Sequence, residues 1–223
     1  MKIKGLDISI YQKGMSFNIA RDQGYKFMIL RGGYTTNGGV RNRRKDLEFS
    51  HFYDKCQKYG IRSGVYYYSC AQNYNEGKQD AIFLYNECLK GRLFEYPIYI
   101  DVEDSYMLKA GRRGCTDAVH GFCQTLEGLG YFAGFYTGYY TLTEYMIPSE
   151  LLRYTFWGAW WKDNQNPPKA LKDFENFKMW QHSGGGEQIG SYGVDGDKAY
   201  VDFPKIIRQN ELNGWKEVLH GKV

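Results

Sequence analysis

The chain has 223 residues, with 29 Lys plus Arg against 25 Asp plus Glu, and its formal net charge is +4. An excess this small and dispersed argues against a nucleic-acid-binding surface. A chain with 43% hydrophobic and 24% charged residues and five prolines is neither low-complexity, collagen-like nor disordered. Aromatic residues make up 17% of the chain, led by 21 tyrosines, and rings with a polar tip suit a surface that is both flat and wet.

The cysteines and the first residues bear on redox state and location. The five cysteines are odd in number and lack Cys-x-x-Cys spacing, so we expect free thiols, no metal site and no cofactor. The chain begins without the apolar stretch of a signal peptide, and no segment approaches the roughly 20 apolar residues of a membrane span. We therefore expect a protein made in the cytoplasm without a membrane-spanning segment.

Strand and helix patterns alternate along the chain in five pairs. The pairs, each a strand then a helix, are 3–10 with 17–24, 26–31 with 46–59, 61–69 with 76–89, 97–103 with 116–129, and 131–137 with 139–154. The basic segment 41–45 is expected in a Gly-rich loop. After residue 154 the pattern changes to strands, over 156–161, 177–182, 188–192 and 199–203, followed by a helix opened by Pro204.

This order predicts the architecture. Strands separated by helices of this length form βαβ units with a parallel sheet. Five units followed by strand-rich sequence favour a closed barrel over an open sheet. We expect one catalytic domain over residues 1–223, of α/β class, folded as an irregular TIM-like barrel with five βα units followed by three further strands.

Residue alternation in the strands places acidic side chains inside this barrel. In segment 97–103 the aliphatic side chains share the face expected under the helices: Ile98, Ile100 and Val102. Asp101 and Glu103 then point inward at the carboxyl end of the strand, where barrel active sites lie. The same parity directs Asp7 inward from the first strand and Asp202 from the last.

Four carboxylates at one end of a barrel suit glycosidic bond cleavage. Crowding in a water-poor site separates their pKa values, so that one carboxyl stays protonated beside an ionised neighbour. An acid then protonates the leaving oxygen while an anion faces the oxocarbenium-like centre. Glu103, at the very end of its strand and with the longer reach, is the expected acid, and Asp101 is the expected ionised partner. Asp-x-Glu alone is a weak motif, but on a buried Ile-rich strand an unused charge is costly.

Aromatic side chains gather at the same predicted strand ends. The residues concerned are Tyr66, Tyr67, Tyr68, Tyr136, Trp157, Trp160, Trp161 and Trp180. Sugar rings stack on such side chains through their apolar faces, although any one of these residues can instead fill the core. The expected substrate-binding residues are Tyr66, Tyr68, Tyr136 and Trp160, together with Arg31 and Gln181.

In order and spacing these motifs resemble glycoside hydrolase family 25, the lysozymes that include many bacteriophage endolysins. The matching segments are G-L-D-I-S-I-Y-Q (5–12), P-I-Y-I-D-V-E (97–103), G-F-Y-T (134–137), W-G-A-W-W (157–161), M-W-Q (179–181) and V-D (201–202). The resemblance spans essentially the whole chain. It implies the same barrel and cleavage of the β-1,4 bond between N-acetylmuramic acid and N-acetylglucosamine in peptidoglycan.

The resemblance also implies roles for the acidic residues. Glu103 matches the family's acid/base. Asp101 matches the residue that orients or stabilises the 2-acetamido group of the substrate or an intermediate. Asp7 matches the opening Asp and Asp202 the late Asp. The family usually runs Gly-x-x-Gly-x-Val-Asp-Leu-Asn where this chain has G-V-D-G-D-K-A-Y-V-D-F-P (193–204), so Asp195 and Asp197 stay open as alternatives to Asp202.

Two alternative functions stay open at this point. One is a chitinase-like hydrolase of N-acetylglucosamine polymers, and the other is a non-catalytic module that binds cell-wall glycans. In the favoured interpretation the partner is a peptidoglycan glycan strand, without nucleic acid, and the protein is a monomer. It reaches the wall after release through a holin-type or other export route.

Overall fold

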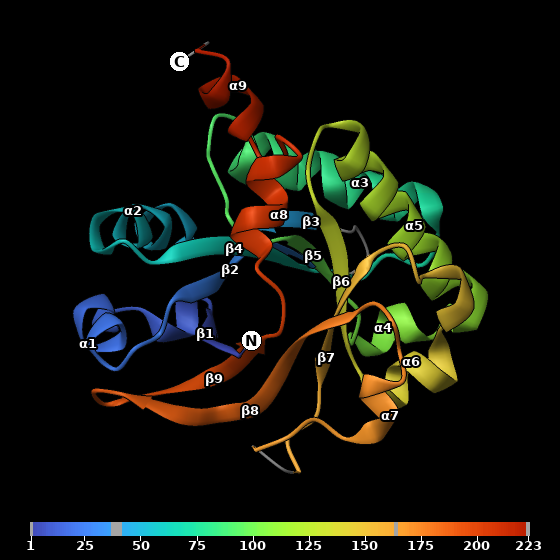
Figure 1. Cartoon of the computed structure of the whole chain (residues 1–223). Helices are drawn as coiled ribbons and strands as arrows, with labels where there is room; N and C mark the ends of the chain where they lie inside the picture. The colour runs from blue at the N-terminus through green and yellow to red at the C-terminus, as the bar shows by residue number, and fades with distance from the viewer. Residues whose placement is uncertain (1, 37–41, 163–164, 222–223) are drawn as a thin grey trace.

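The structure, a computed structural model, describes residues 2–36, 42–162 and 165–221. Its strands form one sheet that closes on itself through pairing of the first two strands, in the order β1-β9-β8-β7-β6-β5-β4-β2-β3 (Figure 1). The strands are β1 (Ile3–Ile8), β2 (Phe27–Thr36), β3 (Asn42–Lys45), β4 (Arg62–Tyr68), β5 (Ile98–Asp101), β6 (Ala133–Gly138), β7 (Thr155–Ala159), β8 (Phe177–Ile189) and β9 (Tyr192–Ala199).

Helices connect the first strands and lie outside the barrel, and further helices follow β7 and β9 (Figure 1). They are α1 (Phe17–Asp22), α2 (Phe49–Tyr59), α3 (Tyr74–Leu84), α4 (Ser105–Leu108), α5 (Gly111–Gly128), α6 (Tyr139–Tyr145), α7 (Lys169–Lys172), α8 (Phe203–Gln209) and α9 (Trp215–Leu219). None of the described helices has the length and apolarity needed to cross a membrane.

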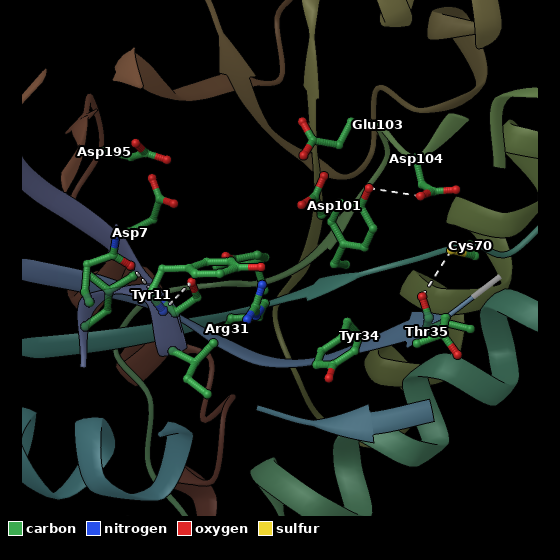
Figure 2. Close-up of a pocket in the computed structure, with 17 residues that line it drawn as sticks. Asp7, Tyr11, Arg31, Tyr34, Thr35, Cys70, Asp101, Glu103, Asp104 and Asp195 are labelled. Carbon is green, nitrogen blue, oxygen red and sulfur yellow. Dashed lines mark hydrogen bonds between the residues drawn. The ribbon is translucent and has the colours of Figure 1, made fainter. Parts of the chain in front are cut away.

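The predicted barrel of five βα units and three further strands is confirmed. Strands β1, β2, β4, β5, β6, β7 and β8 run parallel, whereas β9 is antiparallel to both of its neighbours and closes the barrel. The carboxyl ends of the parallel strands therefore meet at one end, where a cavity opens (Figure 2).

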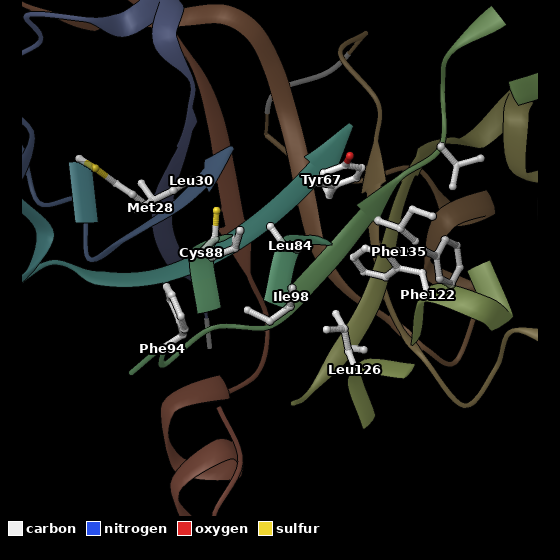
Figure 3. Packing of buried hydrophobic residues seen from close by; sticks show 14 of the residues in the cluster. Met28, Leu30, Tyr67, Leu84, Cys88, Phe94, Ile98, Phe122, Leu126 and Phe135 are labelled. Atoms are coloured by element: carbon white, nitrogen blue, oxygen red, sulfur yellow. The ribbon is translucent and has the colours of Figure 1, made fainter. Parts of the chain in front are cut away.

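The strand faces divide as the alternation predicts. Ile98, Ile100 and Val102 belong to the large core between the sheet and its helices. In Figure 3, Leu84 of α3 lies against Ile98 of β5, and the α5 side chains lie beside β6. The opposite faces fill the barrel with a second apolar cluster: Phe27, Ile29, Tyr96, Tyr99, Tyr136, Trp157, Met179, Ala199, Phe203 and Ile207.

The C-terminal segment closes the other end of the barrel. Phe203 and Ile207 of α8 are fully buried within the inner cluster. Buried Asn213 follows this helix, and its side chain donates to the Tyr96 carbonyl at 2.9 Å and accepts from the Phe132 amide at 2.7 Å. These contacts seal the amino ends of β5 and β6, so the barrel is open to ligand at the carboxyl ends.

The last strands differ from the expectation. Strand β8 runs continuously to Ile189, and β9 covers Tyr192–Ala199, so the strand predicted over 199–203 is wrong. The glycines at 184–186 suggest a break, but shifts in register absorb them within the β8–β9 hairpin. The end of this hairpin lies beside α1 (Figure 1), where the Tyr192 hydroxyl donates to the Lys13 carbonyl at 2.6 Å.

Two boundaries near the amino terminus also differ. The first strand ends at Ile8, because Ser9 and Gln12 form a reciprocal capping box that starts a 3₁₀ turn over Ile10–Gln12. The expected basic loop is instead strand β3, which pairs antiparallel with β2. Arg41 of that segment lies outside the described residues.

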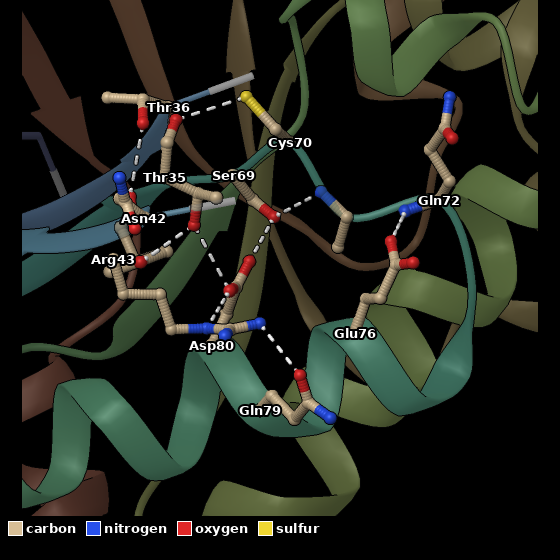
Figure 4. Close-up of polar contacts among 12 residues, drawn as sticks. Thr35, Thr36, Asn42, Arg43, Ser69, Cys70, Gln72, Glu76, Gln79 and Asp80 are labelled. Atoms are coloured by element: carbon tan, nitrogen blue, oxygen red, sulfur yellow. Dashed lines mark hydrogen bonds and ion pairs between the residues drawn. The ribbon is translucent and has the colours of Figure 1, made fainter. Parts of the chain in front are cut away.

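A buried carboxylate ties the β2–β3 hairpin to a helix. Asp80 of α3 accepts hydrogen bonds from Arg43 Nε at 2.7 Å, Ser69 Oγ at 2.6 Å and Thr35 Oγ1 at 3.1 Å (Figure 4). The Thr35 hydroxyl also contacts the hydroxyl of Tyr67 at 2.8 Å. With an ionic partner and two hydroxyl donors, this buried charge is satisfied, and it fixes the ends of β2 and β4 beside the cavity.

Helices α3 and α5 cross where each carries a glycine. A Cβ added at Gly121 would collide with the Tyr74 carbonyl oxygen, and one added at Gly77 with the Ala118 carbonyl oxygen. In both cases the obstacle is backbone, which cannot rotate away. The two glycines therefore set the close approach of the helices that cover β4 to β6.

Gly121→Ala is expected to lower the free energy of unfolding by about 2 kcal/mol, the usual cost of overpacking. This is despite the gain of about 1 kcal/mol in helix propensity that alanine brings over glycine. Thermal or urea unfolding measures the change.

Gly128→Ala, at the end of the same helix, is the matched control, because a Cβ there meets open space. It should be neutral or slightly stabilising. Equal stability of the two variants would show that the helices do not approach as described.

Candidate active site

The cavity at the carboxyl ends of the strands has a volume of about 660 Å³. A smaller cavity of about 110 Å³ continues it toward β6 to β8, and a third of about 410 Å³ extends it over α6 and the end of β7. Glu103 lines all three. The three form one groove that passes over this carboxyl group.

Three of the four predicted carboxylates lie together in this groove. Asp101 is the last residue of β5 and Glu103 follows it by two, while Asp7 comes from β1. Figure 2 shows Asp7 and Asp195 on one side of the cavity and Asp101 and Glu103 facing them across it. The Asp-x-Glu segment and the opening Asp are thus placed as the strand parity predicts.

Asp202 is not in the groove, which corrects the predicted fourth carboxylate. It lies beyond β9, and its side chain caps α8 by accepting from the Lys205 amide at 3.1 Å. The prediction from residue alternation failed because β9 ends at Ala199, so Asp202 lies outside the strand. Asp195 takes the place instead, since it is paired with Asp7 across the β1–β9 ladder and lines the same cavity.

The end of β9 supplies a second inward carboxyl. Asp197 is fully buried below Asp195, opposite Gly5 of β1, and its Oδ1 accepts from the Trp157 indole at 2.8 Å. Asp195 nearer the cavity accepts a hydrogen bond from the Gly185 amide in the bend of β8. The β8–β9 hairpin therefore aims one carboxyl at the groove and buries the other beneath it.

Burial and mutual repulsion hold protons on these groups. Burial raises the pKa of Asp101 well above its ordinary range, and the charges of Glu103 and Asp7 raise it further. Burial and the charges of Asp195 and Asp104 raise the pKa of Glu103. For Asp7, burial and the Asp195 charge raise the pKa to about 8. A cluster whose charges compete in this way can keep one carboxyl protonated beside an ionised one.

A chain of hydrogen bonds fixes Asp7. The Gln181 side-chain amide of β8 donates to Asp7 Oδ2 at 2.8 Å. Its carbonyl oxygen accepts from the Tyr136 hydroxyl at 2.8 Å and from the Trp161 indole at 3.1 Å. The orientation of the Gln181 amide follows from these partners, and Asp7 is held at the groove by residues of β8, of β6 and of the segment that follows β7.

Arg31 is the one cation among the described residues that line the largest cavity. Its Nε donates to buried Asp46 Oδ2 at 2.7 Å, and the guanidinium lies 5.3 Å from the ring centres of both Tyr11 and Tyr34. Asp46 also accepts from the Ile10 amide at 3.1 Å. This side of the groove is therefore lined by two aromatic rings and a guanidinium that packs over them, the kind of side chains on which a sugar can stack.

The predicted aromatic residues divide between groove and core. Tyr66 and Tyr68 line the largest cavity, Tyr136 and Gln181 the smallest, and Trp160 the third. Tyr67 and Trp180 instead face outward into the core between sheet and helices. Adjacent residues on a strand point to opposite faces, so runs such as 66–68 cannot all face the ligand.

Several groove residues were absent from the sequence prediction. Tyr11, Tyr34, Asp104 and Tyr140 all line the groove. Tyr34 lies in β2 beyond residue 31, where the predicted strand ended, and the others lie in a 3₁₀ turn, before a helix or in a helix, where strand alternation does not apply. The inward position of Asp195 could have been predicted from the sequence. If residues 192–199 are assigned as a strand, residue alternation places Asp195 and Asp197 on the same face.

The five cysteines are buried free thiols, as predicted. Within residues 2–36, 42–162 and 165–221, no group of three or more His, Cys, Asp and Glu side chains is arranged to hold a metal ion.

Comparison with known proteins identifies this arrangement. A family model described as Glycosyl hydrolases family 25 matches residues 6–191. No curated protein matches the chain. Among solved structures, the CTP1L endolysin superposes with a TM-score of 0.75 at 20% identity, over 93% of this chain and 70% of that one.

Two single-domain relatives superpose along almost their full length. A lysozyme from Streptomyces coelicolor gives a TM-score of 0.70 at 19% identity, over 96% of this chain and 98% of that one. A family GH25 lysozyme from Aspergillus fumigatus gives 0.72 at 19% identity, over 93% and 98%. These likenesses establish the shared fold, and the family model spans most of the sequence. The chain belongs to glycosyl hydrolase family 25.

Proposed function

We propose that the protein cleaves the β-1,4 bond between N-acetylmuramic acid and N-acetylglucosamine in peptidoglycan. The observation that carries this is the placement of Asp101 and Glu103 at the end of one strand, across a groove from Asp7 and Asp195. Asp101 is buried at the end of β5, and Glu103 lines the groove two residues beyond it, with the groove continuing on both sides of Glu103. Such a groove suits a bond inside a glycan chain.

Glu103 is the proton donor in this proposal. Its raised pKa keeps the carboxyl protonated when an ordinary Glu would be ionised, so it can give its proton to the oxygen of the leaving sugar. The C–O bond breaks as that proton is transferred, and the same carboxylate later takes a proton from the attacking water. Asp101 orients the 2-acetamido group and faces the positive charge that develops at the anomeric carbon.

The aromatic surfaces bind the sugars on either side of the cleaved bond. Tyr66, Tyr68 and the Arg31 layer lie on one side of Glu103. Trp160, Trp161 and Tyr140 lie on the other, and the last two are 58% and 68% exposed. These rings offer stacking faces with little conformational entropy to lose on binding. In this proposal the protein acts on the wall as a monomer, after release from the cytoplasm.

Glu103→Gln is expected to reduce wall hydrolysis by about a hundredfold or more, because the amide cannot donate a proton as an acid. Folding and binding to wall fragments should be retained, since the side chains have the same shape. Turbidity clearance of cell walls and a pull-down with insoluble walls measure the two properties. Clearance at the wild-type rate would rule out Glu103 as the acid.

Asp195→Asn is expected to lower the pKa of Glu103, because the Asp195 charge is among the causes that raise it. Activity is lost as pH rises and Glu103 ionises, so the alkaline limb of the pH–rate profile should move to lower pH. Asp202→Asn is the matched control, since Asp202 caps α8 outside the groove. A shift in the control and none in Asp195→Asn would restore Asp202 as the fourth carboxylate.

Mass spectrometry of digested walls tests the bond itself. Fragments with N-acetylmuramic acid at the new reducing end are expected from a muramidase. Fragments ending in N-acetylglucosamine, or faster release of reducing ends from chitin oligomers than from peptidoglycan, would favour the chitinase-like alternative. Tight wall binding without any released fragment would favour a binding module.

A further inference from the structure

Asp197 is a buried acid that the proposed reaction does not use. It lies one pleat deeper in the barrel than Asp195, opposite Gly5, and its exposed fraction is 0%. An isolated buried charge is among the costliest groups in a fold. The contacts of this carboxyl therefore have to account for its presence.

Asp197 has one ordinary donor. Its Oδ1 accepts from the neutral indole of Trp157 at 2.8 Å. Its Oδ2 is equally shielded, and no amide, hydroxyl or cationic donor among the described residues reaches it. Asp7 lies two residues along β1 from Gly5, the register partner of Asp197, and the two carboxyl groups are close enough to share a hydrogen bond if one of them carries a proton.

Two carboxyl groups in contact can form a hydrogen bond only when one of them carries a proton. Asp7 is the better anion of the two, because the Gln181 amide donates to it at 2.8 Å and its side chain reaches the cavity. Asp197 is less accessible to water than Asp7, and its one ordinary donor, the Trp157 indole, is weaker. The shared proton therefore belongs on Asp197.

The other groups that face Asp7 and Asp197 do not favour a negative charge on both of these residues. They are Asp195 on β9, Asp101 and Glu103 at the end of β5, Tyr66 on β4, Tyr99 on β5 and Tyr136 on β6. All are acidic or neutral. Arg31 is the cation that lines the cavity, and its Nε is bound to Asp46.

We propose that Asp197 stays protonated when Asp7 ionises, and that its hydroxyl donates the second of two hydrogen bonds that orient the Asp7 carboxylate. Asp197 is thus a positioning residue that acts through Asp7. The inference rests on the proposed function and adds that Asp7, which lines the groove opposite Asp101 and Glu103, takes part in catalysis. The hydrogen bond itself does not depend on which glycan bond is cleaved.

Two substitutions distinguish a role of Asp197 as a hydrogen-bond donor from a role in packing alone. Asp197→Asn keeps an acceptor for Trp157 and supplies an amide donor to Asp7, so it should keep a kcat close to wild type. Asp197→Leu has a similar volume but no donor, and it should lose about tenfold or more in kcat, the usual effect of losing a hydrogen bond to a charged group. Asp202→Asn is the control at an exposed cap. An Asn variant as impaired as the Leu variant would overturn the proposal.

Infrared difference spectroscopy reads the proton directly, without substrate. At about pH 9, one unit above the pKa of about 8 for Asp7, wild type minus Asp197→Asn should show the C=O band of a protonated carboxyl. The Asp202→Asn difference should lack it. Absence of the band in the first difference would show that Asp197 is ionised and overturn the proposal, even if Asp197→Leu fails to fold. If instead the bond assignment is wrong, the digestion products change while this band remains.

Discussion

The crowding of carboxyl groups at one end of the barrel is the constraint on which the rest of the site depends. Asp7, Asp101, Glu103 and Asp195 line one cavity, with Asp197 buried beneath them. Few cations among the described residues offset these negative charges, so protons and neutral hydrogen-bond donors must stabilise the carboxyl groups. Gln181, Trp157 and the Gly185 amide supply those donors, and the electrostatic strain that remains keeps protons on buried acids, as acid catalysis of glycoside cleavage requires.

The barrel fold determines how these carboxyl groups are arranged. Asp7 and Asp195 are neighbours because β9 runs antiparallel to β1, which pairs their strands residue by residue. Asp101 reaches the cavity because β5 ends there, and α8 closes the opposite end of the barrel. The Asp80 network and the glycine crossing of α3 and α5 hold the surrounding strands in place without entering the groove.

Much of this could be predicted from the sequence, where simple alternation applies. The parity of 97–103 placed Ile98 and Ile100 under the helices and Asp101 in the cavity, and the same reasoning placed Asp7. The prediction failed at Asp202, because it placed the last strand over 199–203, whereas β9 covers Tyr192–Ala199. Residues from turns, such as Tyr11 and Asp104, have no periodicity that could reveal them. Their positions depend on side-chain hydrogen bonds, including the capping box of Ser9 and Gln12.

The aromatic surplus has two separate uses in this fold. Tyr99 and Trp157 fill the barrel below the carboxyl groups, and their burial removes water from the acids above them. Tyr66, Trp160 and Trp161 surround the groove. The most direct measurement of the central claim is a carbon-13 NMR titration of the Glu103 carboxyl, assigned by comparison with Glu103→Gln. The account predicts a pKa above the ordinary value of 4.5 for Glu, and titration at or below that value would contradict it.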